Sequence, residues 1–129
     1  MILVDTSVWV RADRDKGSPE GIELDSLLAQ DEVAITDVVA AEVLQGSRSE
    51  SDFQRLASDF DALHYFPVQR ATWMRAAELA FQLRRNGQTT ALSDLIIAAV
   101  AIENGLPVYA TDTDFLRVPG LQMHQAGRR

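Results

Sequence analysis

The sequence predicts an α/β fold in which helices cover both faces of a central, mainly parallel sheet of four or five short strands, in three layers. Short apolar runs alternate along the chain with longer segments whose apolar residues recur at helical spacing. The helical segments begin at residues that cap helices, such as Ser18, and end at residues that stop them, such as Gly46. This alternation favours parallel pairing, because parallel strands need long crossover connections.

The first half of the chain has the patterns of two strands and four helices. Residues 2–4, "ILV", are wholly apolar, as in a strand that is buried on both faces. Ser18 followed by Pro19 is a typical helix start, because serine caps a helix and proline fits its first position. The expected strands are 2–4 and 32–36, and the expected helices are 6–13, 19–30, 37–46 and 51–63.

The second half of the chain continues the alternation. Residues 64–68 have a weak strand pattern, and the helix that begins at Arg70 is stopped by Asn86 and Gly87. The helix expected at 93–105 is apolar almost all round, which indicates that it is buried. The remaining expected strands are 106–111 and, as a candidate fifth strand, 120–124.

Length and composition exclude several classes of protein. The 129 residues, 47% hydrophobic and 24% charged, are typical of a single globular domain spanning 1–129. No apolar stretch reaches the roughly 18–20 residues of a membrane span, and the N-terminus lacks the features of a signal peptide. The absence of cysteine excludes disulfides and thiolate metal sites and favours a cytoplasmic location. With only two histidines, a histidine-rich zinc site is not expected.

The net charge of −7 is unevenly distributed along the chain. Residues 1–66 contain 14 acidic and 5 basic residues, whereas residues 67–129 contain 5 acidic and 7 basic residues. An acidic surface repels nucleic acid. An enzyme that binds cations nevertheless needs its own carboxylates, so the charge alone does not exclude a nucleic-acid substrate.

Several acidic residues fall at the ends of predicted strands or on the helices that follow them. Asp5 directly follows the first strand, and Asp112 follows the strand at 106–111, with Asp114 two residues later. Glu42 lies on the helix after the strand at 32–36, and Asp94 starts the buried helix before the last main strand. Ligands of parallel α/β sheets bind outside the carboxyl ends of the strands. We therefore expect these carboxylates to meet at one edge of the sheet.

Each acid taken alone also has a structural explanation. Asp5 can cap the next helix, Asp94 can interact with a helix dipole, and Asp112 and Asp114 can be turn residues. Glu42 is harder to explain, because its helix neighbours are apolar and an unpaired buried charge is costly. Clustered carboxylates repel one another unless a cation lies among them. Oxygen ligands without cysteine suit Mg²⁺ or Mn²⁺, so we expect one or two such ions.

Four segments resemble the motif blocks of PIN-domain ribonucleases, and in particular those of VapC-type toxins from bacterial toxin–antitoxin pairs. The segments are "VDTSV" at 4–8, "AEVLQG" at 41–46, "LSDLIIAAVA" at 92–101 and "YATDTDFLRV" at 109–118. Each is weak alone, but four in this order and spacing are specific and span nearly the whole chain. The resemblance implies a PIN-like sandwich, metal-dependent endoribonuclease activity, a homodimer and a cognate antitoxin.

The same resemblance implies roles for individual residues. "TDTDF" lets either Asp112 or Asp114 act as the fourth family acid, and we favour Asp112. Cleavage by this family implies a 5′-phosphate and a 3′-hydroxyl as products. The implied catalytic and metal-binding residues are Asp5, Glu42, Asp94 and Asp112, with Asp114 as a further metal ligand and Thr6 and Thr111 as residues that order the site.

Substrate, partner and assembly give further expectations. RNA phosphates must approach past positive residues, and Arg84, Arg85 and Arg117 are the candidates to contact them. Trp73 and Phe81 on the helix that begins at Arg70 indicate more apolar surface than one core absorbs, which favours a homodimer. An antitoxin can inhibit a carboxylate site by inserting an arginine that pairs with it. The alternative function is a PIN-like dimeric interaction module that has lost catalysis, against which the intact acidic set argues.

Overall fold

The computed structural model describes residues 1–127 and has one parallel sheet at its centre. Its strands lie in the order β3-β2-β1-β4, and every pairing is parallel. Leu3 of β1 lies between Ala34 of β2 and Val108 of β4. The carboxyl end of β1 is therefore flanked by those of β2 and β4. The strands are β1 (Ile2–Val4), β2 (Val33–Thr36), β3 (His64–Phe66) and β4 (Val108–Tyr109).

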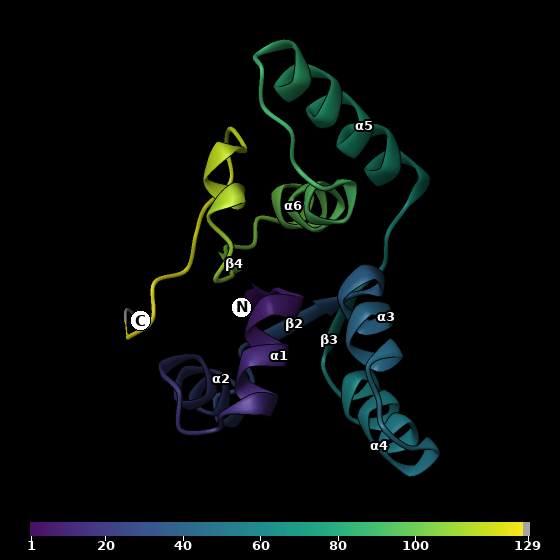
Figure 1. The fold of residues 1–129 in the computed structure, drawn as a ribbon, viewed down its shortest axis with the longest axis vertical. Helices are drawn as coiled ribbons and strands as arrows, with labels where there is room; N and C mark the ends of the chain where they lie inside the picture. The colour runs from purple at the N-terminus through teal and green to yellow at the C-terminus, as the bar shows by residue number, and fades with distance from the viewer. Residues whose placement is uncertain (128–129) are drawn as a thin grey trace.

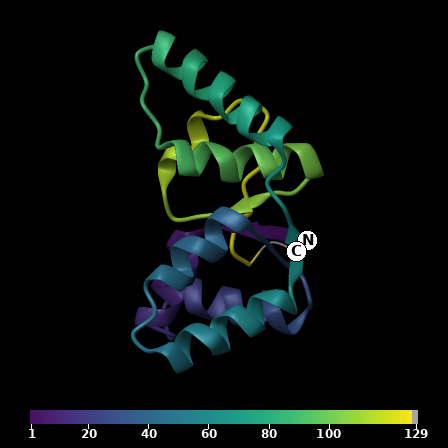
Figure 2. The same ribbon diagram turned by 90° about the vertical axis from the view of Figure 1, so that its right-hand side faces the viewer.

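Helices cover both faces of this sheet and give the molecule three layers. Figures 1 and 2 show α5 and α6 on one side of the sheet and α1 and α2 on the other, with α3 and α4 beside the end formed by β2 and β3. The helices are α1 (Thr6–Arg14), α2 (Pro19–Ala29), α3 (Asp37–Gln45), α4 (Glu50–Asp61), α5 (Arg70–Arg85), α6 (Leu92–Asn104) and the short 3₁₀-helix η1 (Thr113–Arg117). The predicted three-layer α/β class is confirmed.

The alternation of side chains along β1 divides the interior into two cores. Ile2 and Val4 point to one face, where they pack with Val8 of α1 and with leucines of α2. Leu3 points to the other face and belongs to the larger core beneath α6. A strand buried on both faces must be wholly apolar, which explains "ILV" at the start of the chain.

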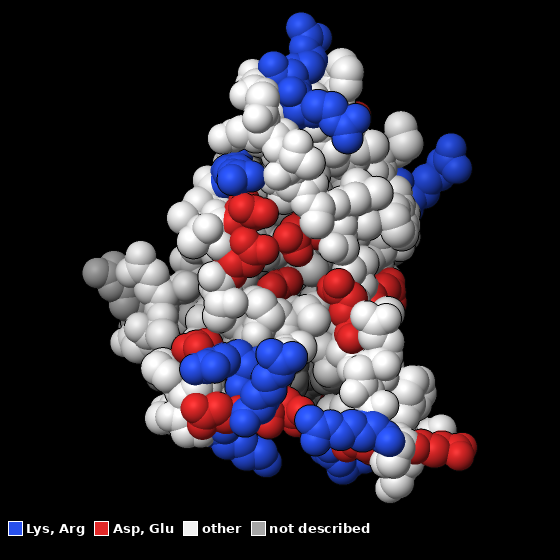
Figure 3. Space-filling model, in the orientation of Figure 1, with Lys and Arg blue, Asp and Glu red and all other residues white. Residues whose placement is uncertain are grey.

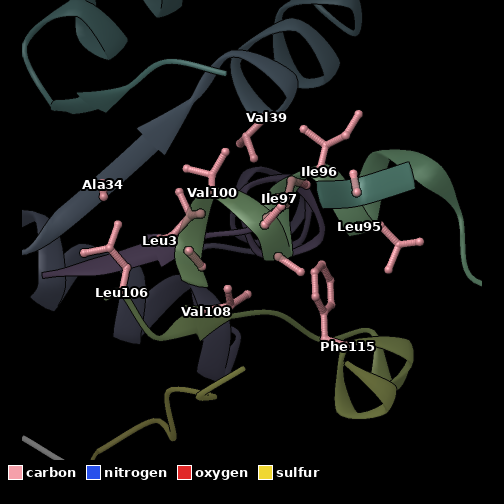
Figure 4. Packing of buried hydrophobic residues seen from close by; sticks show 14 of the residues in the cluster. Leu3, Ala34, Val39, Leu95, Ile96, Ile97, Val100, Leu106, Val108 and Phe115 are labelled. Atoms are coloured by element: carbon pink, nitrogen blue, oxygen red, sulfur yellow. The ribbon is translucent and has the colours of Figure 1, made fainter. Parts of the chain in front are cut away.

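Helix α6 lies at the centre of the larger core, as its apolar sequence predicts. All seven residues from Leu95 to Ala101 are buried. Figure 4 shows side chains of α6 between Leu3 and Val108 of the sheet, Val39 of α3 and Phe115 of η1. This packing fixes the helix whose first turn carries Asp94.

The C-terminal strands are shorter than the sequence pattern indicates. β4 contains only two residues, and the candidate fifth strand at 120–124 is reduced to one parallel bridge between Val108 and Met123. The next side chain, His124, instead pairs with Glu23 of α2. No helix within residues 1–127 is both long and apolar enough to cross a membrane.

Candidate active site

Asp5 lies at the carboxyl end of the central strand, where β1 passes into α1. It is the N-cap of α1, and its Oδ2 accepts hydrogen bonds from the backbone N–H of Ser7 (3.1 Å) and from Ser7 Oγ (2.6 Å). The side chain is buried, with the whole residue only 4% exposed. Burial raises the pKa of Asp5, the Ser7 hydrogen bonds oppose that rise, and the nearby Glu42 carboxylate adds to it. The helix cap and the site acid are thus the same residue.

Glu42 reaches the same place from α3. Its Oε1 accepts a hydrogen bond of 2.7 Å from Thr6 Oγ1. The contact joins the first turn of α1 to the middle of α3, across 36 residues of sequence. Thr6, expected to order the site, therefore does contact one of the expected acids.

Asp94, Asp112 and Asp114 form the other side of the cluster. Asp94 lies in the first turn of α6, and Asp112 is the N-cap of η1, where its Oδ1 accepts from the Asp114 N–H at 2.9 Å. Each of the three residues offers one carboxylate oxygen, and these oxygens all lie within 4.8 Å of one another. Figure 3 shows acidic side chains gathered near the middle of one face of the molecule.

The charges of the other four expected acids act on Asp94. The pKa of Asp94 is raised to about 7, chiefly by burial, and further by the charges of Asp5, Asp112, Glu42 and Asp114. Mutual repulsion among carboxylates is what a divalent cation relieves. The donor set is oxygen alone, which fits a hard cation such as Mg²⁺ or Mn²⁺ and not a metal that prefers thiolate or imidazole.

Ser7 is an ordering residue that the sequence patterns did not single out. Its hydroxyl donates to Asp5 and accepts from the Thr111 backbone N–H at 3.1 Å. It therefore ties the end of β1 to the segment that follows β4 and leads to Asp112. The signal in the sequence was the Asp-x-Ser spacing, since serine two residues after an N-cap can hydrogen-bond its carboxylate. Thr111 takes part in this link through its backbone.

The three expected phosphate-contacting arginines have different surroundings. Arg117 lies beside the acids, with its Nη2 3.5 Å from Asp114 Oδ1. Arg84 and Arg85 are exposed in the last turn of α5, and the Arg85 guanidinium lies 5.6 Å from the centre of the Phe81 ring. Among residues 1–127, neither Arg84 nor Arg85 forms an ion pair with the acidic cluster.

Comparison with known sequences places this architecture in a family. Residues 2–121 match the family model described as the PIN domain. The chain is 33% identical over 129 residues to a VapC ribonuclease of Mycobacterium bovis and to ribonuclease VapC11 of Mycobacterium tuberculosis, covering 95% of this chain and 96% of each relative. Ribonuclease VapC18 of Mycobacterium tuberculosis is 32% identical over 125 residues, covering 94% of this chain and 89% of the relative.

Solved structures show the same fold. VapBC2 from Rickettsia felis, bound to a promoter DNA fragment, matches with a TM-score of 0.78 at 24% identity, covering 96% of this chain and 98% of that one. VapBC-5 from Mycobacterium tuberculosis matches with a TM-score of 0.61 at 26% identity, covering 94% and 92%. The matched family model, the VapC relatives and the shared fold agree with the motif resemblance, and this chain belongs to the PIN-domain family, in its VapC group.

Proposed function

We propose that this protein is a metal-dependent endoribonuclease and the toxin of a toxin–antitoxin pair. One observation carries the proposal: five carboxylates from four segments of the chain meet at the carboxyl edge of the sheet, where burial and the charges of the other four acids raise the pKa of Asp94 to about 7. The names of the relatives, VapC ribonucleases, support RNA as the substrate.

The roles of the residues follow from their positions. Asp5, Glu42, Asp94 and Asp112 would hold Mg²⁺ or Mn²⁺, as one or two ions, with Asp114 beside them. A bound divalent cation supplies an activated water and neutralises charge on the phosphoryl oxygens. Thr6 and Ser7 hold Glu42 and Asp5 in place by hydrogen bonds of 2.7 and 2.6 Å. These bonds reduce the reorganisation that the acids undergo when a cation binds.

The basic residues near the site provide a route for the substrate. The acids of the N-terminal half repel RNA, so phosphates approach past the end of α5 and the turn after β4. Arg84 and Arg85 are exposed at the end of α5, and Arg117 lies next to Asp114. We propose Arg84 and Arg85 as residues that attract the phosphate backbone.

A cognate antitoxin is the proposed regulator. Solved neighbours include VapBC2 of Rickettsia felis and a toxin–antitoxin complex from Klebsiella pneumoniae, the latter with a TM-score of 0.72. An antitoxin arginine inserted among the carboxylates would form charge-assisted hydrogen bonds and displace the cation. The free protein then cleaves RNA, and the complex does not.

A homodimer is proposed from the exposed face of α5. Figure 2 shows α5 at the outer end of the molecule, on the far side of α6 from the sheet. Trp73, Met74 and Phe81 on this helix are 50%, 55% and 62% exposed. Large apolar side chains grouped on one helix mark an interaction surface. A monomeric mass by light scattering at micromolar concentration would contradict the dimer.

The test is cleavage of a defined RNA by the purified protein with Mg²⁺, Mn²⁺ or EDTA, followed by sequencing of the product ends. We expect cleavage with either metal, none with EDTA, and none by the Asp94→Asn variant. Equal cleavage by Asp94→Asn and wild type would point to a contaminating nuclease and remove the support for the site. A well-folded wild type that binds antitoxin but cleaves no RNA would support the alternative, a PIN-like interaction module.

A further inference from the structure

Arg117 connects two segments that border the acidic cluster. Its Nη1 donates a hydrogen bond of 3.0 Å to the carbonyl oxygen of Thr89, in the loop between α5 and α6. Its Nη2 lies 3.5 Å from Asp114 Oδ1 on η1. Among residues 1–127, it is the only basic side chain in an ion pair with any of the five acids of the site.

The end of the loop between α5 and α6 forms few other hydrogen bonds. Within the described chain, the Arg117 bond is the only hydrogen bond that reaches residues 89 and 90. The hydroxyl of Thr90 is buried without a partner. Helix α6 begins directly after Ala91, which has no side chain that can cap it. Core packing of Leu95 to Ala101 fixes the body of α6, so the Arg117 bond acts on the loop before the helix and on its uncapped first turn.

That helix start carries Asp94, two residues after Leu92. Nη1 of Arg117 contacts Thr89, in the segment before Asp94, and Nη2 contacts Asp114, two residues after Asp112. We propose that Arg117 is a positioning residue, which fixes the α5–α6 loop against η1 and thereby sets the spacing of Asp94 and Asp112. Its importance for cleavage rests on the proposed function, whereas the link itself does not.

The link also distinguishes the two aspartates of "TDTDF". Asp114 already has a guanidinium beside one oxygen, whereas Asp112 forms no ion pair among the described residues. Asp112 therefore has no cationic partner that competes with a metal ion, whereas Asp114 is the partner of Arg117. Supporting partners of this kind are worth about 10–100-fold in metal affinity when removed.

An arginine is required because two different nitrogens in one plane serve two partners. Lysine has a single nitrogen on a flexible stem, so it cannot reproduce both contacts at once. A residue that only attracted phosphate would need charge alone, which lysine supplies. Arg117→Lys therefore separates positioning from phosphate contact.

The experiment compares wild type with Arg117→Ala, Arg117→Lys and the control Arg55→Ala. Arg55 pairs with Asp52 on α4 at the same three-residue spacing as Arg117 with Asp114, so the control removes an equivalent exposed ion pair elsewhere. Hydrogen exchange of residues 86–94 is measured on metal-free protein, and Mn²⁺ affinity is measured by calorimetry. We expect both Arg117 variants to exchange faster in 86–94 and to bind Mn²⁺ at least about 10-fold more weakly. Arg55→Ala should match wild type in both measurements.

Unchanged exchange in Arg117→Ala would overturn the proposal. So would an Arg117→Lys variant with wild-type exchange and Mn²⁺ affinity, combined with a raised KM for RNA in Arg117→Ala alone, because that pattern belongs to a phosphate contact. The hydrogen-exchange and Mn²⁺-affinity measurements are both made without RNA. A wild type that cleaves nothing would thus count against the proposed function while leaving the exchange result to decide the role of Arg117.

Discussion

Two equally buried acids of this protein have opposite surroundings. Glu23 of α2, 5% exposed, has its Oε2 2.7 Å from His124 Nε2 and accepts a hydrogen bond of 3.2 Å from the Gly127 N–H. Asp5, 4% exposed, accepts from the neutral N–H and hydroxyl of Ser7, forms no ion pair among residues 1–127, and has another acid, Glu42, nearby. A buried acid with a basic partner stabilises the fold, whereas a buried acid among other acids is a candidate ligand for a cation.

The two environments also act on different parts of the fold. The Glu23–His124 pair attaches the C-terminal segment to α2, and the His124 ring lies edge-on to Tyr109 of β4 at 5.2 Å. The Asp5 cluster instead contains acids from the segments that follow β1 and β4, from the middle of α3 and from the first turn of α6, at the sheet edge where ligands of parallel sheets bind. Neutralising one acid should therefore affect cleavage in the Asp5 cluster and stability in the Glu23–His124 pair.

The largest expected effect is on cleavage. Asp5→Asn should lower the cleavage rate by at least about 100-fold, because the loss of a proposed metal ligand should cost more than the loss of a supporting partner, which costs about 10–100-fold. The matched variant Glu23→Gln should stay within about 2-fold of wild type, since Glu23 lies outside the site. Initial rates on one defined RNA at saturating Mn²⁺ measure both. A larger loss in Glu23→Gln than in Asp5→Asn would contradict the comparison.

The next effect is on stability and concerns Glu23. Glu23→Gln should reduce the free energy of unfolding by about 1–3 kcal/mol, because a charge-assisted hydrogen bond to His124 is replaced by a neutral one in a buried place. Urea unfolding followed by circular dichroism measures the change. An unchanged midpoint would mean that the pair does not hold the C-terminal segment.

The pH dependence of stability should show the burial of Asp94 among other carboxylates. The pKa of Asp94 is about 7 in the folded protein, above its ordinary value of 3.8, so the folded state binds the proton more tightly than the unfolded state does. The stability that protonation gives is lost as the pH rises towards 7. The Tm of metal-free wild type should fall between pH 5 and pH 8, and that of Asp94→Asn should fall less. If the Tm of Asp94→Asn fell with pH as much as that of wild type, Asp94 would not be the cause.

The smallest expected effect concerns the rim of the site. Arg84→Ala combined with Arg85→Ala should weaken RNA binding across sequences and lower the slope of log affinity against log salt by about one unit for each arginine that touches a phosphate. Filter binding to the inactive Asp94→Asn background at several salt concentrations gives the slope. An unchanged slope would mean that residues other than Arg84 and Arg85 attract the phosphates.

Much of the fold followed from local patterns. The wholly apolar β1, the capping Ser18 and the apolar α6 are local signals, because each depends on residues close together in sequence. The meeting of the site acids at one sheet edge was also predictable, since strand ends of a parallel sheet share an edge. β4 was predicted too long, because only Val108 and Tyr109 pair with β1, and the extent of that pairing is not visible in the composition of residues 106–111.

The remaining features depend on contacts between distant residues. Glu23 and His124 are 101 positions apart, and nothing near either residue indicates the other. The same holds for Ser7 and Thr111, which are 104 positions apart, and for Arg117 and Thr89. Arg117 was expected to contact phosphate because its charge is visible in the sequence, whereas its partners are visible only in the structure.

The central claim is that the carboxylates around Asp94 form a divalent-cation site, and thermal unfolding at increasing Mn²⁺ concentration at about pH 7.5, above the pKa of Asp94, tests it most directly. A ligand that binds only the folded state raises the Tm with the logarithm of its concentration. We expect this rise for wild type and for Glu23→Gln, and no rise for Asp94→Asn. A Tm that is independent of Mn²⁺ in wild type, or a rise that persists in Asp94→Asn, would contradict the claim.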